Sequence, residues 1–511
     1  MGVRATLICA RYSYMLRISN RKNGKMTQRR ISHDVLINLG FSILKSLLLF
    51  LSLGFAARIL PVELLGVLLL SRRIAVMLAN ALQMGVSQTL IRYIPLNHSN
   101  ERYKAALLYN SGVVLVIVSG MFFLLSNVFS EFVLNFIYSG VVQDLSVIPW
   151  FMLLVMATIF HYFLYSILLG SRRIIMANFF ELMSAAGIIF VVLLFFEPFE
   201  TIYDLLKPLS LISALLSVSG VLYCLAVSPR IKKWRLDEFS ETIKTIGVYG
   251  VPRGISSFLD ISILAILPWV IGAYPKDVSY LILSFTILRI LQVAISPITQ
   301  VLSIVVARQI GEGRVEGLEK SSRVIITSSL FLCMLPLSIF WPWGFDFTQL
   351  WLGDQELSQG VWRYLSIISF AILPYTIFYT LRNLIDVVWV QPKNLWTLAG
   401  AVFVQLSGSW LLNEQGLEPS WWLSGVFLLS VTVMGGMSLY WLRAYLPEIS
   451  YVKPLTLIIS GGGLFIINTI CSDLSFVAGI PMALALSLAI IVMSLARLIK
   501  SPIGRDILKQ L

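Results

Sequence analysis

Long apolar blocks separated by short polar segments make up most of the chain. Each block holds about 20 residues, the length that a helix needs to cross the hydrocarbon core of a bilayer. The blocks are continuous rather than alternating, so they predict helices and not the short strands of an outer-membrane barrel. The pattern therefore predicts an all-α polytopic membrane protein with about 14 transmembrane helices. Their expected limits are 36–57, 64–86, 105–127, 146–170, 178–196, 208–228, 249–273, 279–305, 324–344, 362–386, 395–412, 421–441, 454–472 and 475–496.

The composition agrees with this pattern and excludes several classes of protein. Hydrophobic residues make up 58% of the 511 residues and charged residues 13%, and the mean hydropathy is +0.85. Soluble proteins hold about 45–50% apolar and about 25% charged residues, so a soluble enzyme, a disordered chain and a disulfide scaffold are excluded. The four cysteines and three histidines show no metal-ligand spacing. No nucleophile elbow, phosphate-binding loop or dinucleotide fingerprint occurs, so we expect no catalytic residue, metal or bound cofactor.

The basic residues fall mainly on one side of the predicted spans. The net charge of +13 would suggest a nucleic-acid partner in a soluble protein, but in a membrane protein basic residues report orientation. Of the 39 Lys and Arg residues, 29 share one side with both termini, three lie on the other side and seven lie within spans. The positive-inside rule therefore predicts that both termini are cytoplasmic. We expect no nucleic-acid partner.

Polar positions inside the first and second six spans repeat at one offset. Lys45 in the first span and Asp260 in the seventh are 215 residues apart, and Arg73 in the second span and Arg289 in the eighth are 216 apart. Because six is an even number, the two copies are expected to be parallel, related by an axis along the membrane normal. Further polar residues extend the stripes of the two arginines at seven-residue steps: Asn80 and Ser87 after Arg73, and Ser296 and Ser303 after Arg289.

This repeat predicts the organisation of the chain. Two pseudo-symmetric six-helix lobes are expected, followed by two C-terminal helices. The expected segments are a basic cytoplasmic segment 1–34, an N-lobe 35–228, a cytoplasmic linker 229–248, a C-lobe 249–441, and the last two helices with a cytoplasmic tail 442–511.

Basic residues near mid-span carry the functional signal. Each costs about 3 kcal/mol if it faces lipid, so it should face water or a partner. Three other basic residues lie near span ends and can extend to the interface: Arg253, Arg363 and Arg382. The mid-span residues are Lys45, Arg72, Arg73 and Arg289.

Two interpretations of these charges remain open. In the first, a central cationic cavity binds an anion. In the second, the cations pair with Glu181, Asp260 and Asp386 and fix helix packing. Lys45 and Asp260 would then pair across the lobes, or Asp260 would carry a coupling proton or gate the cavity. His161 is expected to be a packing residue, although its ordinary pKa would suit a proton relay.

Three segments resemble the Wzx-type oligosaccharide flippases of the multidrug/oligosaccharidyl-lipid/polysaccharide exporter superfamily. The segment 60–66 (LPVELLG) resembles the outer turn of these flippases, and 83–92 (QMGVSQTLIR) resembles the end of their second helix. The segment 249–252 (YGVP) resembles the start of their second lobe. Together with fourteen spans in two six-helix halves, the resemblance covers nearly the whole chain from about residue 35.

The resemblance implies two lobes around a central cavity that opens alternately to the two sides of a bacterial-type inner membrane. It also implies that the cargo is a polyprenyl-pyrophosphate-linked oligosaccharide for surface polysaccharides such as O-antigen or exopolysaccharide. The residues expected to bind the pyrophosphate are Arg73, Arg289, Lys45, Arg72 and Arg253. The expected partners are the lipid-linked oligosaccharide and membrane lipids, together with a polysaccharide polymerase and glycosyltransferases. Transport would be coupled to H⁺ or Na⁺.

Four alternatives differ in what they require of the sequence. A lipid II flippase of the same superfamily also needs a cationic cavity, and the sequence separates it weakly from the Wzx type. An exporter of cationic drugs would need acidic rather than basic cavity residues. A membrane glycosyltransferase or polymerase would place catalytic groups on sizeable outer loops, whereas these loops are short. A scaffolding membrane protein would have no need of arginine on paired helices.

Overall fold

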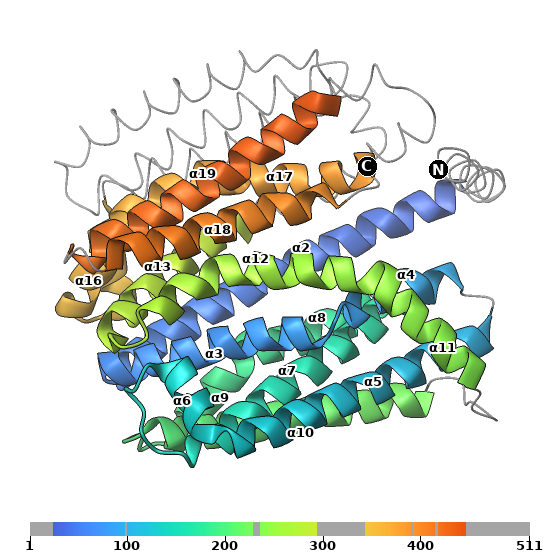
Figure 1. Cartoon of the computed structure of the whole chain (residues 1–511), viewed down its shortest axis with the longest axis horizontal. Coiled ribbons are helices and arrows are strands. Elements are labelled where there is room, and N and C mark those ends of the chain that lie inside the picture. The colour runs from blue at the N-terminus through green and yellow to red at the C-terminus, as the bar shows by residue number, and fades with distance from the viewer. Residues whose placement is uncertain are drawn as a thin grey trace.

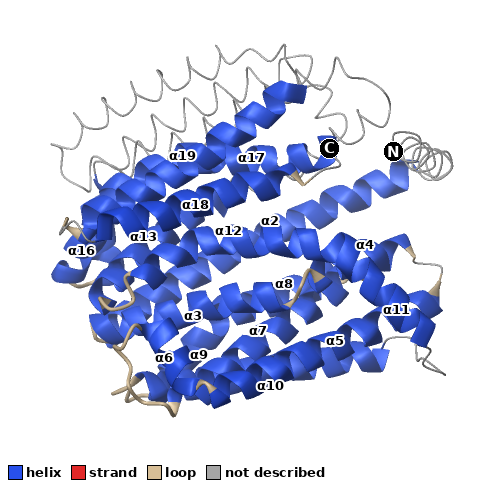
Figure 2. Ribbon diagram, in the orientation of Figure 1, coloured by secondary structure: helices blue, strands red, loops and turns tan. Residues whose placement is uncertain are grey.

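The computed structural model of this protein describes residues 24–97, 100–227, 236–293, 343–389, 392–413 and 417–445. All regular structure in these ranges is helical (Figure 2). The predicted all-α fold is therefore confirmed. Nine helices in the described ranges are long and apolar enough to cross a membrane. The predicted spans 324–344, 454–472 and 475–496 lie wholly or largely outside the described residues.

We call the helices from α2 to α10 the N-lobe, after the predicted first half; α7 lies at their centre. Helix α7 packs against α10, α4, α3, α5 and α8. It is apolar on all sides, as expected of a helix that is surrounded by protein. The helices are α2 (Gly24–Ile59), α3 (Val62–Leu82), α4 (Val86–Leu96), α5 (Glu101–Val128), α6 (Ser130–Tyr138), α7 (Val147–Gly170), α8 (Ile174–Leu182), α9 (Ile188–Phe195) and α10 (Ile202–Val227).

We call the helices from α12 to α19 the C-lobe, after the predicted second half; α11, in the predicted linker, packs against α5. Helix α19 of the C-lobe packs against α16, α17 and α18, and α12 packs against α18. Figure 1 shows α16–α19 in orange above the blue-to-green N-lobe helices, with α2 and α12 between them. The helices are α11 (Leu236–Thr245), α12 (Val251–Val270), α13 (Pro275–Val293), α16 (Gln355–Ile368), α17 (Ile372–Val388), α18 (Lys393–Asn413) and α19 (Pro419–Tyr445).

Two helical boundaries differ from the sequence prediction. The predicted second span, 64–86, is interrupted after α3, where Met84 and Gly85 adopt positive φ angles of 48° and 75°. This break lets α4 leave in a new direction, since a helix cannot continue through left-handed residues. The predicted linker 229–248 is helical from Leu236 and runs through a π-helical turn at Ile246–Gly250 into α12. Residues 228–235 lie outside the described ranges.

A second π-helical turn interrupts the predicted fifth span. Helix α8 ends at Leu182, the π turn covers Met183–Gly187, and α9 continues from Ile188. A π turn disturbs the regular ladder of backbone hydrogen bonds, and such turns are frequent at functional sites. Here it begins two residues after Glu181, an acid near the cytoplasmic end of the predicted span.

Candidate functional site

Arg73 and Arg289 lie at the centre of the contact between the two lobes. Arg73 is on α3 and Arg289 is on α13, and these two helices pack against each other. Arg73 is half-buried and Arg289 is exposed. Neither forms a hydrogen bond or an ion pair with any residue that the structure describes. Their charges are close enough to repel each other. Within the described residues the site therefore presents two guanidinium groups without a hydrogen bond or ion pair, one from each lobe.

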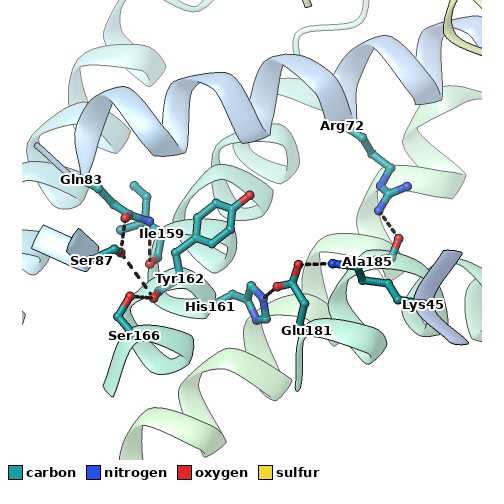
Figure 3. A network of polar contacts seen from close by, with 10 residues as sticks. All are labelled: Lys45, Arg72, Gln83, Ser87, Ile159, His161, Tyr162, Ser166, Glu181 and Ala185. Atoms are coloured by element: carbon teal, nitrogen blue, oxygen red, sulfur yellow. Dashed lines mark hydrogen bonds and ion pairs between the residues drawn. The ribbon is translucent and has the colours of Figure 1, made fainter. Parts of the chain in front are cut away.

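Arg72 points in a different direction from Arg73 and is held within the N-lobe. Its Nη2 donates to the carbonyl oxygen of Ala185 at 2.8 Å (Figure 3). The Ser52 hydroxyl lies 3.4 Å from the next carbonyl, that of Ala186. Both acceptors belong to the π turn, where the disturbed backbone ladder makes carbonyl groups available to side chains. Arg72 therefore joins α3 to the interrupted fifth span, instead of standing beside Arg73.

Lys45 forms an ion pair inside the N-lobe. Its Nζ lies 3.2 Å from Oε1 of Glu181, and the second oxygen, Oε2, lies 3.0 Å from Nε2 of His161. Figure 3 shows Glu181 between these two partners. Asn38, seven residues before Lys45 and on the same face of α2, points the same way and accepts a hydrogen bond of 2.6 Å from Asn178, so the two residues form a polar stripe. This stripe therefore faces α8 of its own lobe.

Asp260 forms an ion pair inside the C-lobe. Its Oδ2 accepts from Nη1 of Arg382 at 2.8 Å, and its Oδ1 accepts from the hydroxyl of Tyr379 at 2.6 Å. The prediction that Arg382 extends to the membrane interface is therefore wrong. A half-buried carboxylate on the neighbouring helix provides a closer partner than the interface does. The suggested pairing of Lys45 with Asp260 across the lobes is also wrong, since each has a partner in its own lobe.

The polar stripe predicted after Arg73 is only partly continuous. Asn80 donates to the carbonyl of Val76 in its own helix at 2.9 Å and is half-buried. Ser87 is buried and donates to Oε1 of Gln83 on the side that faces α7 (Figure 3). Ser87 does not share a face with Arg73, because the break at residues 84–85 separates α4 from α3. The predicted positions Ser296 and Ser303 lie outside the described residues.

The lobes also meet at the end of the molecule formed by α4 and α11, on the right of Figure 1. Nε2 of Gln88 donates to the hydroxyl of Ser257 at 2.8 Å. The ring of Tyr249 lies under two guanidinium groups, at 4.5 Å from that of Arg92 and at 4.0 Å from that of Arg253. Arg253, predicted to bind pyrophosphate, is therefore exposed at this end and distant along the helix from Asp260.

Polar contacts join the lobes at the opposite end as well. The hydroxyl of Ser279 donates to the carbonyl of Val62 at 2.7 Å. Lys276 lies 3.4 Å from Glu63 of the N-lobe and 3.5 Å from Glu356 of the C-lobe. These carboxylates raise the pKa of Lys276, with Glu63 the larger cause. The lobes are thus joined at both ends, with Arg73 and Arg289 between.

Close backbone contacts at both ends depend on glycine. A Cβ on Gly85 would overlap the backbone of Gly250, and a Cβ on Gly66 would overlap the carbonyl of Pro275. Gly66 and Gly85 belong to the segments 60–66 and 83–92 that carry the family resemblance, and Gly250 belongs to 249–252. All three segments therefore contribute to the contact between the lobes.

Sequence reasoning missed several groups around the arginines. Tyr375 and Tyr379, on α17, interact electrostatically with Arg289, and their hydroxyl groups are 3.4 Å apart. A signal was present, since the two tyrosines are four residues apart and therefore share a helix face. The pairing of His161 with Glu181 had no such signal, because it joins two different helices.

The comparisons with known proteins give the class of the fold. Residues 252–389 match the MatE family model. No curated protein sequence matches the chain significantly. The chain is similar to a lipid II flippase MurJ in an inward closed conformation, with a TM-score of 0.72 and 12% identity over 90% of this chain and 99% of that one. The fold is therefore that of the transporters of the multidrug/oligosaccharidyl-lipid/polysaccharide (MOP) superfamily.

Two further solved structures share this fold. An inward-facing multidrug resistance MATE family transporter of the MOP superfamily gives a TM-score of 0.67 and 14% identity, over 82% of this chain and 99% of that one. A MOP superfamily transporter from Pyrococcus furiosus, described by the reverse polarity of its binding pocket, gives a TM-score of 0.56 and 14% identity. The match covers 82% of this chain and 96% of that one. At these identities the likeness defines the fold alone.

Proposed function

We propose that this protein is a membrane transporter that flips a polyprenyl-pyrophosphate-linked oligosaccharide from the cytoplasmic to the outer leaflet. The observation that supports this proposal is the pair Arg73 and Arg289 at the centre of the contact between the lobes, neither of which has a hydrogen bond or ion pair with a described residue. The lobes would open alternately to the two sides. Each opening would expose the same two arginines to a different leaflet.

The chemistry of the cargo fits this pair. A pyrophosphate is a compact multiple anion, and guanidinium groups bind phosphate through two parallel hydrogen bonds. An anion between Arg73 and Arg289 would replace their mutual repulsion by two attractions. It would therefore favour the arrangement in which both lobes hold the head group, while the polyprenyl tail stays in the bilayer.

The acids in the same region support an anionic cargo. Glu181 is occupied by Lys45 and His161, and Asp260 is occupied by Arg382 and Tyr379. A cationic drug would have to displace one of these built-in partners. The MatE match and the likeness to a multidrug transporter keep drug export as the second candidate. A lipid II-type cargo, suggested by the likeness to MurJ, belongs to the same anionic class as our first candidate.

The proposal also gives the protein a place in surface polysaccharide synthesis. Glycosyltransferases would complete the lipid-linked repeat unit on the cytoplasmic side of the inner membrane. A polymerase would use the unit on the outer side. Both termini would be cytoplasmic, as the basic loops predict. Import of H⁺ or Na⁺ would supply the energy.

The first experiment is deletion of the gene, followed by mass spectrometry of lipid-linked sugars in the membrane. We expect one completed polyprenyl-pyrophosphate oligosaccharide to accumulate and the matching surface polymer to be lost. Accumulation of lipid II would instead assign the lipid II cargo. An unchanged lipid-linked pool with an intact surface polymer would favour the drug exporter.

A second experiment tests the arginine pair directly. We expect Arg73→Ala or Arg289→Ala to lower transport about 10- to 100-fold at near-normal protein levels, because each removes a charge-assisted contact of about 1.5–3 kcal/mol. Arg363→Ala is the control, since this exposed arginine makes a single long contact of 3.6 Å with Glu418. Normal transport by both cavity variants would contradict the proposal. Loss of the protein itself would indicate a structural role.

A further inference from the structure

Three side chains meet on the surface at the end of the molecule formed by α4 and α11. The ring centre of Tyr249 lies 4.5 Å from Cζ of Arg92 and 4.0 Å from Cζ of Arg253. Arg92 belongs to α4 of the N-lobe and Arg253 to α12 of the C-lobe, and both are exposed. The boundary between the lobes therefore carries a second pair of neighbouring guanidinium groups, in addition to the central pair Arg73 and Arg289.

The ring of Tyr249 orients the two arginines. A guanidinium group over the face of an aromatic ring is attracted by the negative charge of that face. The group is planar and its N–H donors lie in the plane. The ring therefore occupies the face of each guanidinium group and leaves the N–H edge for an anion. Tyr93 of α4 packs edge-on against Tyr249, with the ring centres 5.4 Å apart, and so supports the ring from the N-lobe.

The helices that carry the two arginines are held together by other residues. Gln88, four residues before Arg92, donates a hydrogen bond of 2.8 Å to Ser257, four residues after Arg253. Residues four apart share a helix face, so this hydrogen bond lies on the same facing sides of α4 and α12 as the arginines. The two guanidinium groups are therefore brought together before any ligand binds, which lowers the entropy that binding costs.

The described acids near this pair interact more strongly with other residues. Arg253 forms no hydrogen bond or ion pair with a residue that the structure describes. Asp386 of α17 interacts electrostatically with Arg253, but more strongly with Arg382. On α11, Glu238 lies 2.6 Å from Arg102 of α5. Two like charges thus share one ring, and an anion between them would replace their repulsion by two attractions.

We propose that Arg92, Tyr249 and Arg253 form a second anion site, which binds a ligand of the phosphate class and bridges the two lobes. Phosphate oxygens match the paired N–H donors of guanidinium groups. The sequence grouped Arg253 with the central arginines, whereas the geometry groups it with Arg92. The proposal goes beyond the proposed transport function, because the site lies on α4 and α12 and shares no residue with the central pair on α3 and α13.

Three sources could supply such a phosphate group. The basic loops predict that this end of the molecule is cytoplasmic. The ligand would then be a lipid-linked pyrophosphate in the cytoplasmic leaflet, the head group of an anionic phospholipid in that leaflet, or free pyrophosphate. In the first case the site would bind the cargo before the central pair does. The chemistry of recognition is the same in all three cases.

The first experiment measures anion binding at this site alone. The full chain with Arg73→Ala and Arg289→Ala, in phosphatidylcholine nanodiscs, is titrated with inorganic pyrophosphate in a calorimeter. We expect binding, and adding Arg253→Gln should weaken it about 10- to 100-fold, because charge-assisted hydrogen bonds are lost. Lys244→Gln, which removes an exposed cation of α11, is the matched control and should leave binding unchanged. Absence of binding, or equal binding with and without Arg253→Gln, would overturn the proposal.

Two substitutions test the ring as a positioning residue. Tyr249→Leu removes the face on which the guanidinium groups lie and should weaken pyrophosphate binding about 2- to 5-fold. Tyr249→Phe keeps the ring and should bind as the parent does. Equal losses in both variants would show that the hydroxyl group matters and would overturn the role of stacking. Thermal unfolding of each variant confirms that the fold is intact.

A distance measurement tests whether the anion bridges the lobes. Spin labels are placed at Leu96 of α4 and at Val248 directly before α12, both of which are exposed. We expect pyrophosphate to narrow the distribution of distances in the parent and to have no effect in Arg253→Gln. A distribution that pyrophosphate leaves unchanged in the parent would overturn the bridging of the lobes.

Competition then identifies the source of the phosphate group. Tighter binding of farnesyl pyrophosphate than of inorganic pyrophosphate would assign the site to lipid-linked pyrophosphates. Loss of pyrophosphate binding in phosphatidylglycerol nanodiscs, at a salt concentration that screens their surface charge, would assign it to phospholipid head groups. Equal affinities and no effect of phosphatidylglycerol would assign it to free pyrophosphate. Each of these results supports the site. If gene deletion leaves lipid-linked sugars unchanged while pyrophosphate still binds here, the proposed function fails and the site stands.

Discussion

The ends and the middle of the contact between the lobes are built differently. At the ends, glycine residues bring backbones together and side chains complete hydrogen bonds, as for Gly85 with Gly250 and for Ser279 with Val62. In the middle, Arg73 and Arg289 lie on packed helices and carry like charges that repel each other. The ends therefore favour a closed contact and the middle opposes it. If the proposed anion binds between Arg73 and Arg289, it would remove this opposition.

The charged pairs on either side of this contact make the contrast sharper. Lys45 and Asp260 occupy equivalent positions of the predicted repeat but carry opposite charges: Lys45 pairs with Glu181, whereas Asp260 pairs with Arg382. The repeat thus preserves the position of a charged pair and not its polarity. Both acids form their ion pairs within their own lobes, and Asp260 also interacts electrostatically with Arg289.

The largest effect is expected from breaking the C-lobe pair. Asp260→Asn should lower the free energy of unfolding by about 3 kcal/mol, because it leaves Arg382 as an uncompensated charge inside the protein. Asp277→Asn is the matched control, since Asp277 also accepts a tyrosine hydrogen bond, of 2.8 Å from Tyr364, and has no arginine partner. The control should cost about 1 kcal/mol. Thermal unfolding in detergent measures both.

A second variant shows whether the loss of stability in Asp260→Asn comes from the unpaired charge of Arg382. Asp260→Asn combined with Arg382→Met should recover most of the stability, because the buried charge is removed together with its partner. Equal losses in Asp260→Asn and Asp277→Asn would show that the hydrogen bond, and not the ion pair, matters at this position.

A smaller effect is expected from disturbing one end of the contact. Gly85→Ala should weaken the closed arrangement by about 1–2 kcal/mol from its positive φ alone, and the overlap of its Cβ with Gly250 adds to this. Gly247→Ala is the control, because a Cβ there meets nothing within 4 Å. Distances between spin labels across this end should lengthen in Gly85→Ala and stay the same in the control.

The fold could be predicted from the sequence because the bilayer imposes a simple rule. Apolar blocks of about 20 residues must be helices, and their limits were close, as for the predicted span 146–170 and the observed α7, Val147–Gly170. The interruptions at residues 84–85 and 183–187 could not be predicted. The first depends on a backbone contact with Gly250 in the other lobe, and the second lies within an uninterrupted apolar run.

The site was predictable in part, for a related reason. The cost of charge in the membrane marks Arg73, Arg289 and Lys45 as residues that need a partner or water. The cost does not say whether a given residue meets a partner or water. Lys45 was assigned to the cavity and is paired with Glu181, because the choice of partner depends on how α2 and α8 pack and not on spacing along the chain.

The smallest effect is expected at the other end of the contact between the lobes, where the exposed Lys276 lies between Glu63 and Glu356. Lys276→Met should loosen this end slightly, which is measured as the distance between labels on α3 and α13. The difference in this distance between Lys276→Met and the parent should shrink as salt is added, because exposed ion pairs are screened.

Glu63 and Glu356 raise the pKa of Lys276 above its ordinary value of 10.5. A raised pKa means that the bridge is fully present below pH 10.5 and is lost as the pH rises through the higher value. The effect of Lys276→Met should thus be constant between about pH 6 and 9. Lys207→Met is the control, because this lysine lies over Trp150 and Tyr203 within one lobe. If the distance at this end instead followed pH in that range, the charge bridge would not be what holds it.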